Sequence, residues 1–64
     1  MVIINGTEWD AAGKNLTEFL TEADYDPQKI VVERNEQIVP KAQYDQTTLM
    51  DGDRVEIISF MGGG

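Results

Sequence analysis

Near its end the chain reads Leu49-Met50-Asp51-Gly52-Asp53-Arg54-Val55-Glu56-Ile57-Ile58-Ser59-Phe60, a tight turn followed by a β-strand. A glycine between two aspartates is typical of a turn. In the strand, Val55 and Ile57 alternate with Arg54 and Glu56, and alternate side chains of a strand point to opposite faces. One face is therefore apolar and the other mostly polar, and we expect this strand to be firmly held in a sheet.

Two β-hairpins are predicted upstream of this strand. The β-branched residues 2–4 lead into Asn5-Gly6, a strong turn signal because both positions accept positive φ, and strand-like residues resume at 7–9. In residues 30–39, two apolar runs flank a polar, turn-like segment, and Pro40 closes the second run. The second hairpin is therefore expected to have a short arm.

A helix of about two and a half turns is predicted between the hairpins. Asn15 followed three residues later by Glu18 resembles a capping box, so the helix should begin near Leu16. Tyr25-Asp26-Pro27 ends it, because proline disfavours the helical conformation of the preceding residue. The residues that place one apolar stripe against the sheet are Leu16, Phe19, Leu20 and Ala23.

The order of elements is hairpin, helix, hairpin and final strand, which predicts one α+β domain over residues 1–60. A helix crossing between two hairpins, with the last strand paired beside the first, is the β-grasp (ubiquitin-like) arrangement. We expect a mixed sheet of about four to five strands with one main helix packed across it, although element order alone leaves other topologies open. Residues 41–46 are expected to be irregular, and residues 61–64 to form a flexible glycine tail.

Composition excludes several classes of function. The 64 residues contain no cysteine and no histidine, so disulfides, thiolate or imidazole metal sites, cysteine nucleophiles and Ser-His triads are excluded. A domain this small also has little room for a deep active site. We therefore expect no catalytic residues, no cofactor and no metal, and a protein on which other proteins act.

The charge of the chain limits its partners. Twelve acidic and five basic residues give a formal charge of -7, which argues against nucleic acid and anionic membranes as partners. The acidity favours solubility, with attraction of a basic partner as the second interpretation. Residues 1–6 lack the features of a signal peptide, and no run approaches the ~20 apolar residues of a membrane span. A cytoplasmic location is expected.

The segment Met61-Gly62-Gly63-Gly64 is the candidate functional site. Glycines give a slim, mobile peptide that can enter a narrow channel in another protein. The carboxylate of a terminal Gly64 is unhindered, so a partner could activate it with ATP as an acyl-adenylate. A sulfur or amine nucleophile could then displace AMP. The expected site of covalent modification is Gly64, within a tail formed by Gly62, Gly63 and Gly64.

Three stretches of the chain follow the patterns of a known family. Residues 1–6 are similar to its first strand and turn. Residues 31–41, V-V-E-R-N-E-Q-I-V-P-K, look like its V-A-V-E-x-N-x-x-I-V-P-R signature, with Lys41 where arginine is usual. Residues 49–58 are similar to its L-x-D-G-D-x-I-E-I-V pattern, and the glycine end follows. Over nearly its whole length the chain thus resembles the ThiS family, the sulfur carriers of thiamine thiazole biosynthesis.

The resemblance implies a cycle of reactions at the C-terminal glycine. An E1-like adenylating enzyme activates Gly64, and sulfur from a cysteine desulfurase system converts it to a thiocarboxylate. Thiazole synthase then takes the sulfur. The expected partners are these three proteins.

Several side chains allow a functional and a structural interpretation. Phe60 and Met61 are candidate docking residues for a partner, although for Phe60 the last core contact of the sheet is favoured. Trp9 is expected to be a partly buried packing residue rather than an interface residue.

Asp51 and Asp53 could suggest a cation site, but without further ligands they are expected to be turn formers. Arg34 and Lys41 could pair with acidic groups of a partner, but simple solvation is favoured.

Three other functions remain open from the residues alone. The carrier of molybdopterin synthesis shares the glycine end but usually has a longer chain and a Pro-Pro-containing approach, which Ile58-Ser59-Phe60-Met61 lacks. A ubiquitin-like protein modifier would use the same activated tail and become joined to lysines. A passive β-grasp binding module or an enzyme subunit would carry inert glycines.

Overall fold

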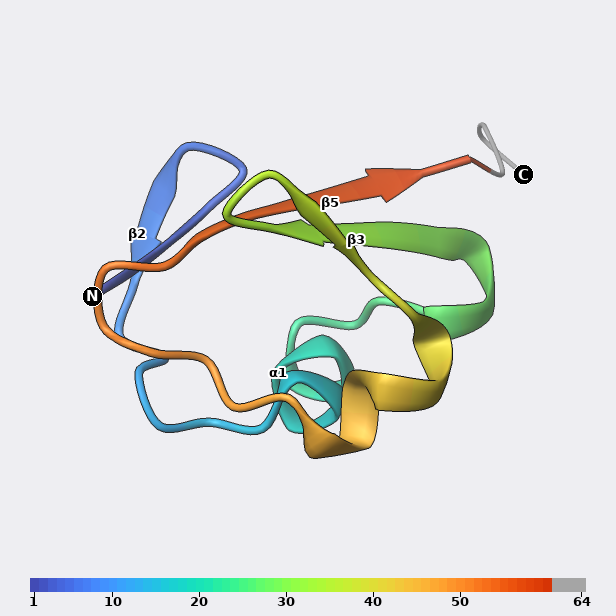
Figure 1. The fold of residues 1–64 in the computed structure, drawn as a ribbon, viewed down its shortest axis with the longest axis horizontal. Helices are drawn as coiled ribbons and strands as arrows, with labels where there is room; N and C mark the ends of the chain where they lie inside the picture. The colour runs from blue at the N-terminus through green and yellow to red at the C-terminus, as the bar shows by residue number, and fades with distance from the viewer. Residues whose placement is uncertain (61–64) are drawn as a thin grey trace.

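The computed structural model describes residues 1–60, which form a sheet with one main helix across one face (Figure 1). The strands are β1 (Val2–Ile4), β2 (Thr7–Trp9), β3 (Ile30–Arg34), β4 (Gln37–Val39) and β5 (Arg54–Ser59). The helical segments are α1 (Leu16–Glu22) and two 3-10 helices, η1 (Pro27–Lys29) and η2 (Lys41–Gln46). Within these sixty residues, no helix has the length and apolar character needed to cross a bilayer.

The last strand lies at the centre of a mixed five-stranded sheet with the order β2-β1-β5-β3-β4. Strand β5 runs parallel to β1, where Ile3 faces Arg54, and antiparallel to β3, where Ile30 faces Ser59. Figure 1 shows β5 passing along the length of the sheet above α1. The predicted α+β, β-grasp arrangement and the pairing of the last strand with the first are confirmed.

Both hairpins turn where the sequence predicts. Asn5 and Gly6 have φ values of 51° and 82°, the left-handed conformation that Asn-Gly turns favour. The second hairpin turns through Asn35 (φ 51°) and Glu36 (φ 70°). Left-handed backbone is uncommon for glutamate, and Asn35 makes side-chain bonds that hold this turn, as described below.

Helix α1 begins at the predicted residue and is shorter than predicted. The Asn15 side chain accepts hydrogen bonds from Thr17 N (2.9 Å) and Glu18 N (3.4 Å), which satisfies two backbone donors at the start of the helix. The helix has seven residues, and Ala23 forms its C-cap. Asp24 follows with φ 67°, which ends the helix before the proline that was expected to end it.

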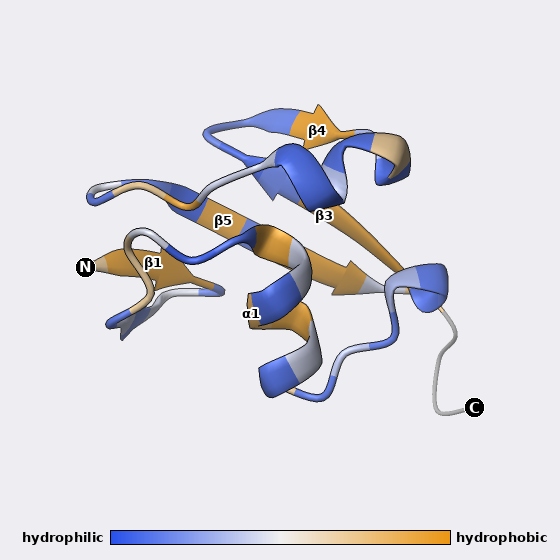
Figure 2. Cartoon of the chain, turned by 90° about the horizontal axis from the view of Figure 1, so that it is seen from below, coloured by the Kyte–Doolittle hydropathy of each residue, from blue (hydrophilic) through white to orange (hydrophobic). Residues whose placement is uncertain are grey.

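The core lies between α1 and one face of the sheet. Figure 2 shows apolar residues gathered along β1, β3 and β5, with α1 in front of them. Trp9 packs edge-on against Phe19, with ring centroids 5.2 Å apart, as its predicted packing role requires, while 43% of it stays exposed. The buried apolar residues are Val2, Ile4, Ala11, Leu16, Phe19, Leu20, Ile30, Val32, Tyr44, Leu49, Val55 and Ile57.

Residues 41–46 are not irregular, and that expectation is wrong. They form η2, whose Tyr44 is buried in the core. The side chain of Thr17 donates to Asp45 Oδ1 (2.6 Å), and Asn15 Nδ2 donates to Asp45 O (2.5 Å), so η2 is attached to the start of α1. These partners lie about thirty residues away in the sequence, beyond the reach of a local pattern.

Candidate functional site at the end of strand β5

The described chain leaves the sheet at Phe60, beside the start of β3. Ser59 and Ile30 are the last paired residues of β5 and β3, and the Phe60 backbone N–H donates to Lys29 O over 3.2 Å. Lys29 ends η1, which the Asp26 side chain caps. The turn of η1 therefore places a carbonyl acceptor where β5 ends.

Lys41 binds the backbone at the same place. Its ammonium group donates to Pro27 O (2.6 Å) and Ile30 O (3.2 Å), and lies 5.7 Å from the centroid of the Phe60 ring. Pro40, with φ -62°, precedes η2 and positions Lys41 as the first residue of that helix. The expectation that Lys41 is simply solvated is wrong, because its ammonium joins η1, β3 and the end of β5.

Phe60 is not a core residue, and that favoured interpretation is also wrong. Val55 and Ile57 are buried against the helix, so alternation along β5 places Phe60 with Ile58 on the opposite side of the sheet. Phe60 is 55% exposed and Ile58 is 48% exposed. The exposure makes Phe60 accessible to another protein, as a docking residue must be.

The open face of the sheet carries an apolar row next to Phe60. Val31 lies opposite Ile58 across β3 and β5, and Ile38 of β4 is 66% exposed. Glu33 faces Ile38 on one side and Glu56 on the other. The apolar row therefore borders a pair of like charges on the same face.

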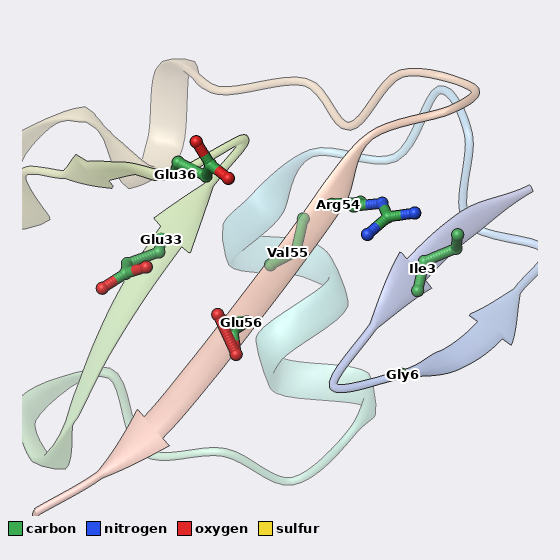
Figure 3. A pocket seen from close by; sticks show the side chains of 7 residues that line it. All are labelled: Ile3, Gly6, Glu33, Glu36, Arg54, Val55 and Glu56. Carbon is green, nitrogen blue, oxygen red and sulfur yellow. The ribbon is translucent and has the colours of Figure 1, made fainter.

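A hollow of about 310 Å³ is lined in part by those glutamates (Figure 3). Figure 3 shows Arg54 between β5 and β1, and Glu56 on β5 beside Glu33 on β3. None of the acidic side chains here takes part in an ion pair within residues 1–60. Over the same residues, no cluster of potential metal ligands is found. The lining residues are Ile3, Gly6, Glu33, Glu36, Arg54, Val55 and Glu56.

The start of β5 is held by a buried carboxylate. Asp53, 7% exposed, accepts hydrogen bonds from Arg34 Nε (2.8 Å), Asn35 Nδ2 (3.1 Å) and Met50 N (2.9 Å). We call these four residues the Asp53 network. Burial raises the pKa of Asp53, but the bonds from Met50, Asn35 and Arg34 outweigh it and lower the pKa below its ordinary value.

The Asp53 network changes two sequence-based interpretations. Asp51 and Asp53 do form the turn, since Asp53 N donates to Met50 O over 3.0 Å around Gly52. Arg34 is not simply solvated, and that expectation is wrong because its guanidinium pairs with Asp53. In the sequence, Asp53 is visible as a polar residue directly before the apolar strand. Its partners Arg34 and Asn35 lie about twenty residues away, beyond the reach of a local pattern.

Asn5 has a second function that the turn signal did not reveal. Its side chain accepts from Ile57 N (2.8 Å) and donates to Ile57 O (3.3 Å). The paired residues of β1 and β5 end at Ile4 and Val55, so the Asn5 amide takes the place of a further backbone partner for β5. The middle of the strand is thereby held on both sides.

The remaining predicted site residues lie outside the described residues. These are the docking candidate Met61 and the tail residues Gly62, Gly63 and Gly64.

The sequence model of the ThiS family matches residues 2–64, the strands, the helix and the glycine end together. The chain belongs to the ThiS family. A solved relative, the ThiS thiamine biosynthesis protein from Geobacter metallireducens, has a TM-score of 0.78 and 36% identity, covering 98% of this chain and 97% of that one. The predicted family and fold are therefore confirmed.

Two relatives contain a similar sequence in chains of different length. The sulfur carrier protein ThiS of Bacillus subtilis is 32% identical over 66 residues, with 100% of both chains covered. The thiazole synthase of Paramagnetospirillum magneticum is 44% identical over 64 residues, which are 98% of this chain and 20% of that protein. The chain thus spans one fifth of that relative. One of these relatives is thus a carrier of about the length of this chain, and the other is a thiazole synthase that contains a ThiS-like segment.

Proposed function

We propose that this chain is a sulfur carrier for thiazole formation in thiamine biosynthesis, with the carboxylate of Gly64 as its working group. The observation that carries the proposal is the ThiS family match, which extends through the glycines to residue 64. The fold is compatible with it, because the central strand β5 leads out of the sheet directly before these residues. A partner can bind the folded body while the tail enters its active site.

The proposed chemistry has two steps at one carboxyl group. A carboxylate oxygen of Gly64 attacks the α-phosphorus of ATP, and pyrophosphate leaves. A sulfur nucleophile then attacks the acyl carbon, and AMP leaves with the oxygen that bridged it to the carbonyl. With hydrosulfide as nucleophile, one C–S bond replaces one C–O bond, a proton is released and no oxidant or reductant is needed.

The chain supplies the acyl group, and its partners supply catalysis. An E1-like adenylating enzyme would carry out the first step, and a desulfurase system would provide the sulfur. The thiocarboxylate would then deliver sulfur to a thiazole synthase. A thiazole synthase that contains a segment 44% identical to this chain supports that last partner.

Intact mass spectrometry tests the proposal. The protein is incubated with ATP, an E1-like activating enzyme and sodium sulfide. We expect a gain of about 16 Da on Gly64, because sulfur replaces oxygen. A chain lacking Gly63 and Gly64 is the matched control and should gain nothing.

Two outcomes would contradict the proposal. Absence of any mass change with several competent activating enzymes would leave an inert binding module as the better account. Conjugates of high molecular weight, joined through lysines, would indicate a protein modifier instead.

A further inference from the structure

The end of β5 depends on few contacts, and Lys41 makes one of them. Phe60 is 55% exposed, so core packing does not fix its ring. Among residues 1–60, its backbone has the single bond from Phe60 N to Lys29 O, and its ring lies 5.7 Å from the Lys41 ammonium. A cation at this distance from an aromatic ring is attracted by the electron-rich face of the ring.

The Lys41 ammonium is itself held in place. A lysine side chain on a surface normally samples many rotamers, but here Pro27 O and Ile30 O accept two of its three N–H groups. The same bonds join η1 to Ile30, the first residue of β3. Lys29, the last residue of η1, has the carbonyl that accepts from Phe60 N. Lys41 therefore supports Phe60 through the ring and through the backbone acceptor.

We infer that Lys41 is a positioning residue for the acyl transfer, which it serves by fixing Phe60 and so the direction in which the chain leaves the sheet. The inference rests on the proposed function of Gly64. A fixed exit direction reduces the number of conformations from which the carboxylate must find the activating site. It therefore lowers the entropic cost of reaching the reactive geometry.

Amide hydrogen exchange at Phe60 tests the physical half of the inference without any enzyme. Lys41→Met keeps an unbranched side chain but removes the cation and its donors. We expect the protection of the Phe60 amide to fall about two- to fivefold, the range of an exposed cation–π contact. Lys41→Arg keeps a cation with several donors and should restore it.

Lys14→Met is the matched control. Lys14 also makes a bond through its ammonium, to Glu22 over 2.8 Å, but on α1's side of the molecule. The substitution removes the same charge, and we expect it to leave exchange at Phe60 unchanged. Equal effects of Lys14→Met and Lys41→Met would overturn the inference, because they would reflect net charge alone.

Kinetics of thiocarboxylate formation test the functional half. Below the unfolding transition, Lys41→Met should lower kcat about two- to fivefold with little change in KM, because the body that the enzyme binds is intact. Lys41→Arg should recover kcat. A merely structural role would lower the unfolding midpoint of Lys41→Met and leave kcat of the folded protein unchanged, and that result would overturn the inference.

The two experiments separate this inference from the proposed function. If the wild-type chain forms no thiocarboxylate, the proposed function fails and the positioning role fails with it, while exchange still reports whether Lys41 fixes Phe60. If thiocarboxylate forms but exchange at Phe60 is the same in Lys41→Met, the proposed function stands and the inference about Lys41 is wrong.

Discussion

The two ends of β5 are held in different ways. At the start, Asp53 is buried and accepts three hydrogen bonds, and Arg54 N donates to Asn35 Oδ1 over 3.0 Å. At the end, Phe60 has one backbone bond of 3.2 Å and a half-exposed ring near Lys41. One strand thus passes from a dense polar anchor to a lightly held exit.

The difference suits the proposed function, in which a partner binds the folded body and the reaction takes place at the tail. An anchored start keeps β5 in register, because slipping by one residue would move Val55 and Ile57 out of the core. A lightly held end leaves Phe60 exposed to the partner that the proposed function requires. Stability should therefore depend on the start of β5, and reactivity on its end.

Among the contacts that hold β5, the anchor is expected to contribute most to stability. Asp53→Asn removes the charge that Arg34 pairs with and places amide donors among other donors. We expect the free energy of unfolding to fall by about 1–3 kcal/mol in urea titrations. Asp51→Asn is the matched control, because Asp51 is exposed and pairs only with the N-terminal ammonium among the described residues. Equal losses in the two variants would show that the Asp53 network is not an anchor.

The next effect concerns the middle of β5. Asn5→Gly keeps a residue that tolerates the left-handed turn but removes both side-chain bonds to Ile57. We expect a loss of about 1–2 kcal/mol in the same titrations, because the backbone groups of Ile57 lose their partner. A stability equal to that of the wild type would mean that water replaces the Asn5 amide without cost.

Acid should weaken the start of β5 in particular. The pKa of Asp53 is lowered on folding, so its stabilising contribution is complete above the ordinary carboxyl value of 3.8. That contribution is lost as the pH falls from this value through the lower pKa of the folded state. Urea midpoints measured across this range should fall less in Asp53→Asn than in the wild type. Parallel pH profiles would show that other carboxylates cause the loss.

The sequence predicted those parts of the fold that depend on neighbouring residues. Asn5-Gly6 specified its turn because both positions tolerate positive φ. Asn15 specified the first residue of α1 because its side chain accepts from backbone donors two and three residues on. The alternation of Val55 and Ile57 predicted the buried face of β5.

The rest depends on contacts between distant segments. Tyr44 is buried because η2 packs beside α1, and a 3-10 helix of six residues gives too short a pattern to predict that. The residues next to Lys41 in the sequence do not indicate that its ammonium will donate to the carbonyl oxygens of residues 27 and 30. For the candidate site, the glycine end and the family were visible in the sequence, whereas the anchor and the exit contacts were not.

The smallest effect on stability is expected at the exit, and it distinguishes the two phenylalanines of the chain. Phe60→Ala removes a ring that is 55% exposed, so the loss should stay below about 1 kcal/mol, the worth of its contact with the Lys41 ammonium. Phe19→Ala removes a ring that is 2% exposed and should lose about 3–5 kcal/mol by opening a cavity in the core.

Urea titrations of both variants decide between a core and an exit function for Phe60. A loss in Phe60→Ala comparable to that in Phe19→Ala would place the Phe60 ring in the core and remove the contrast between the two ends of β5. A small loss together with slower thiocarboxylate formation would assign Phe60 to the exit. Because that variant keeps its fold, the slower reaction would then reflect how the chain leaves the sheet, and not how much of the protein is folded.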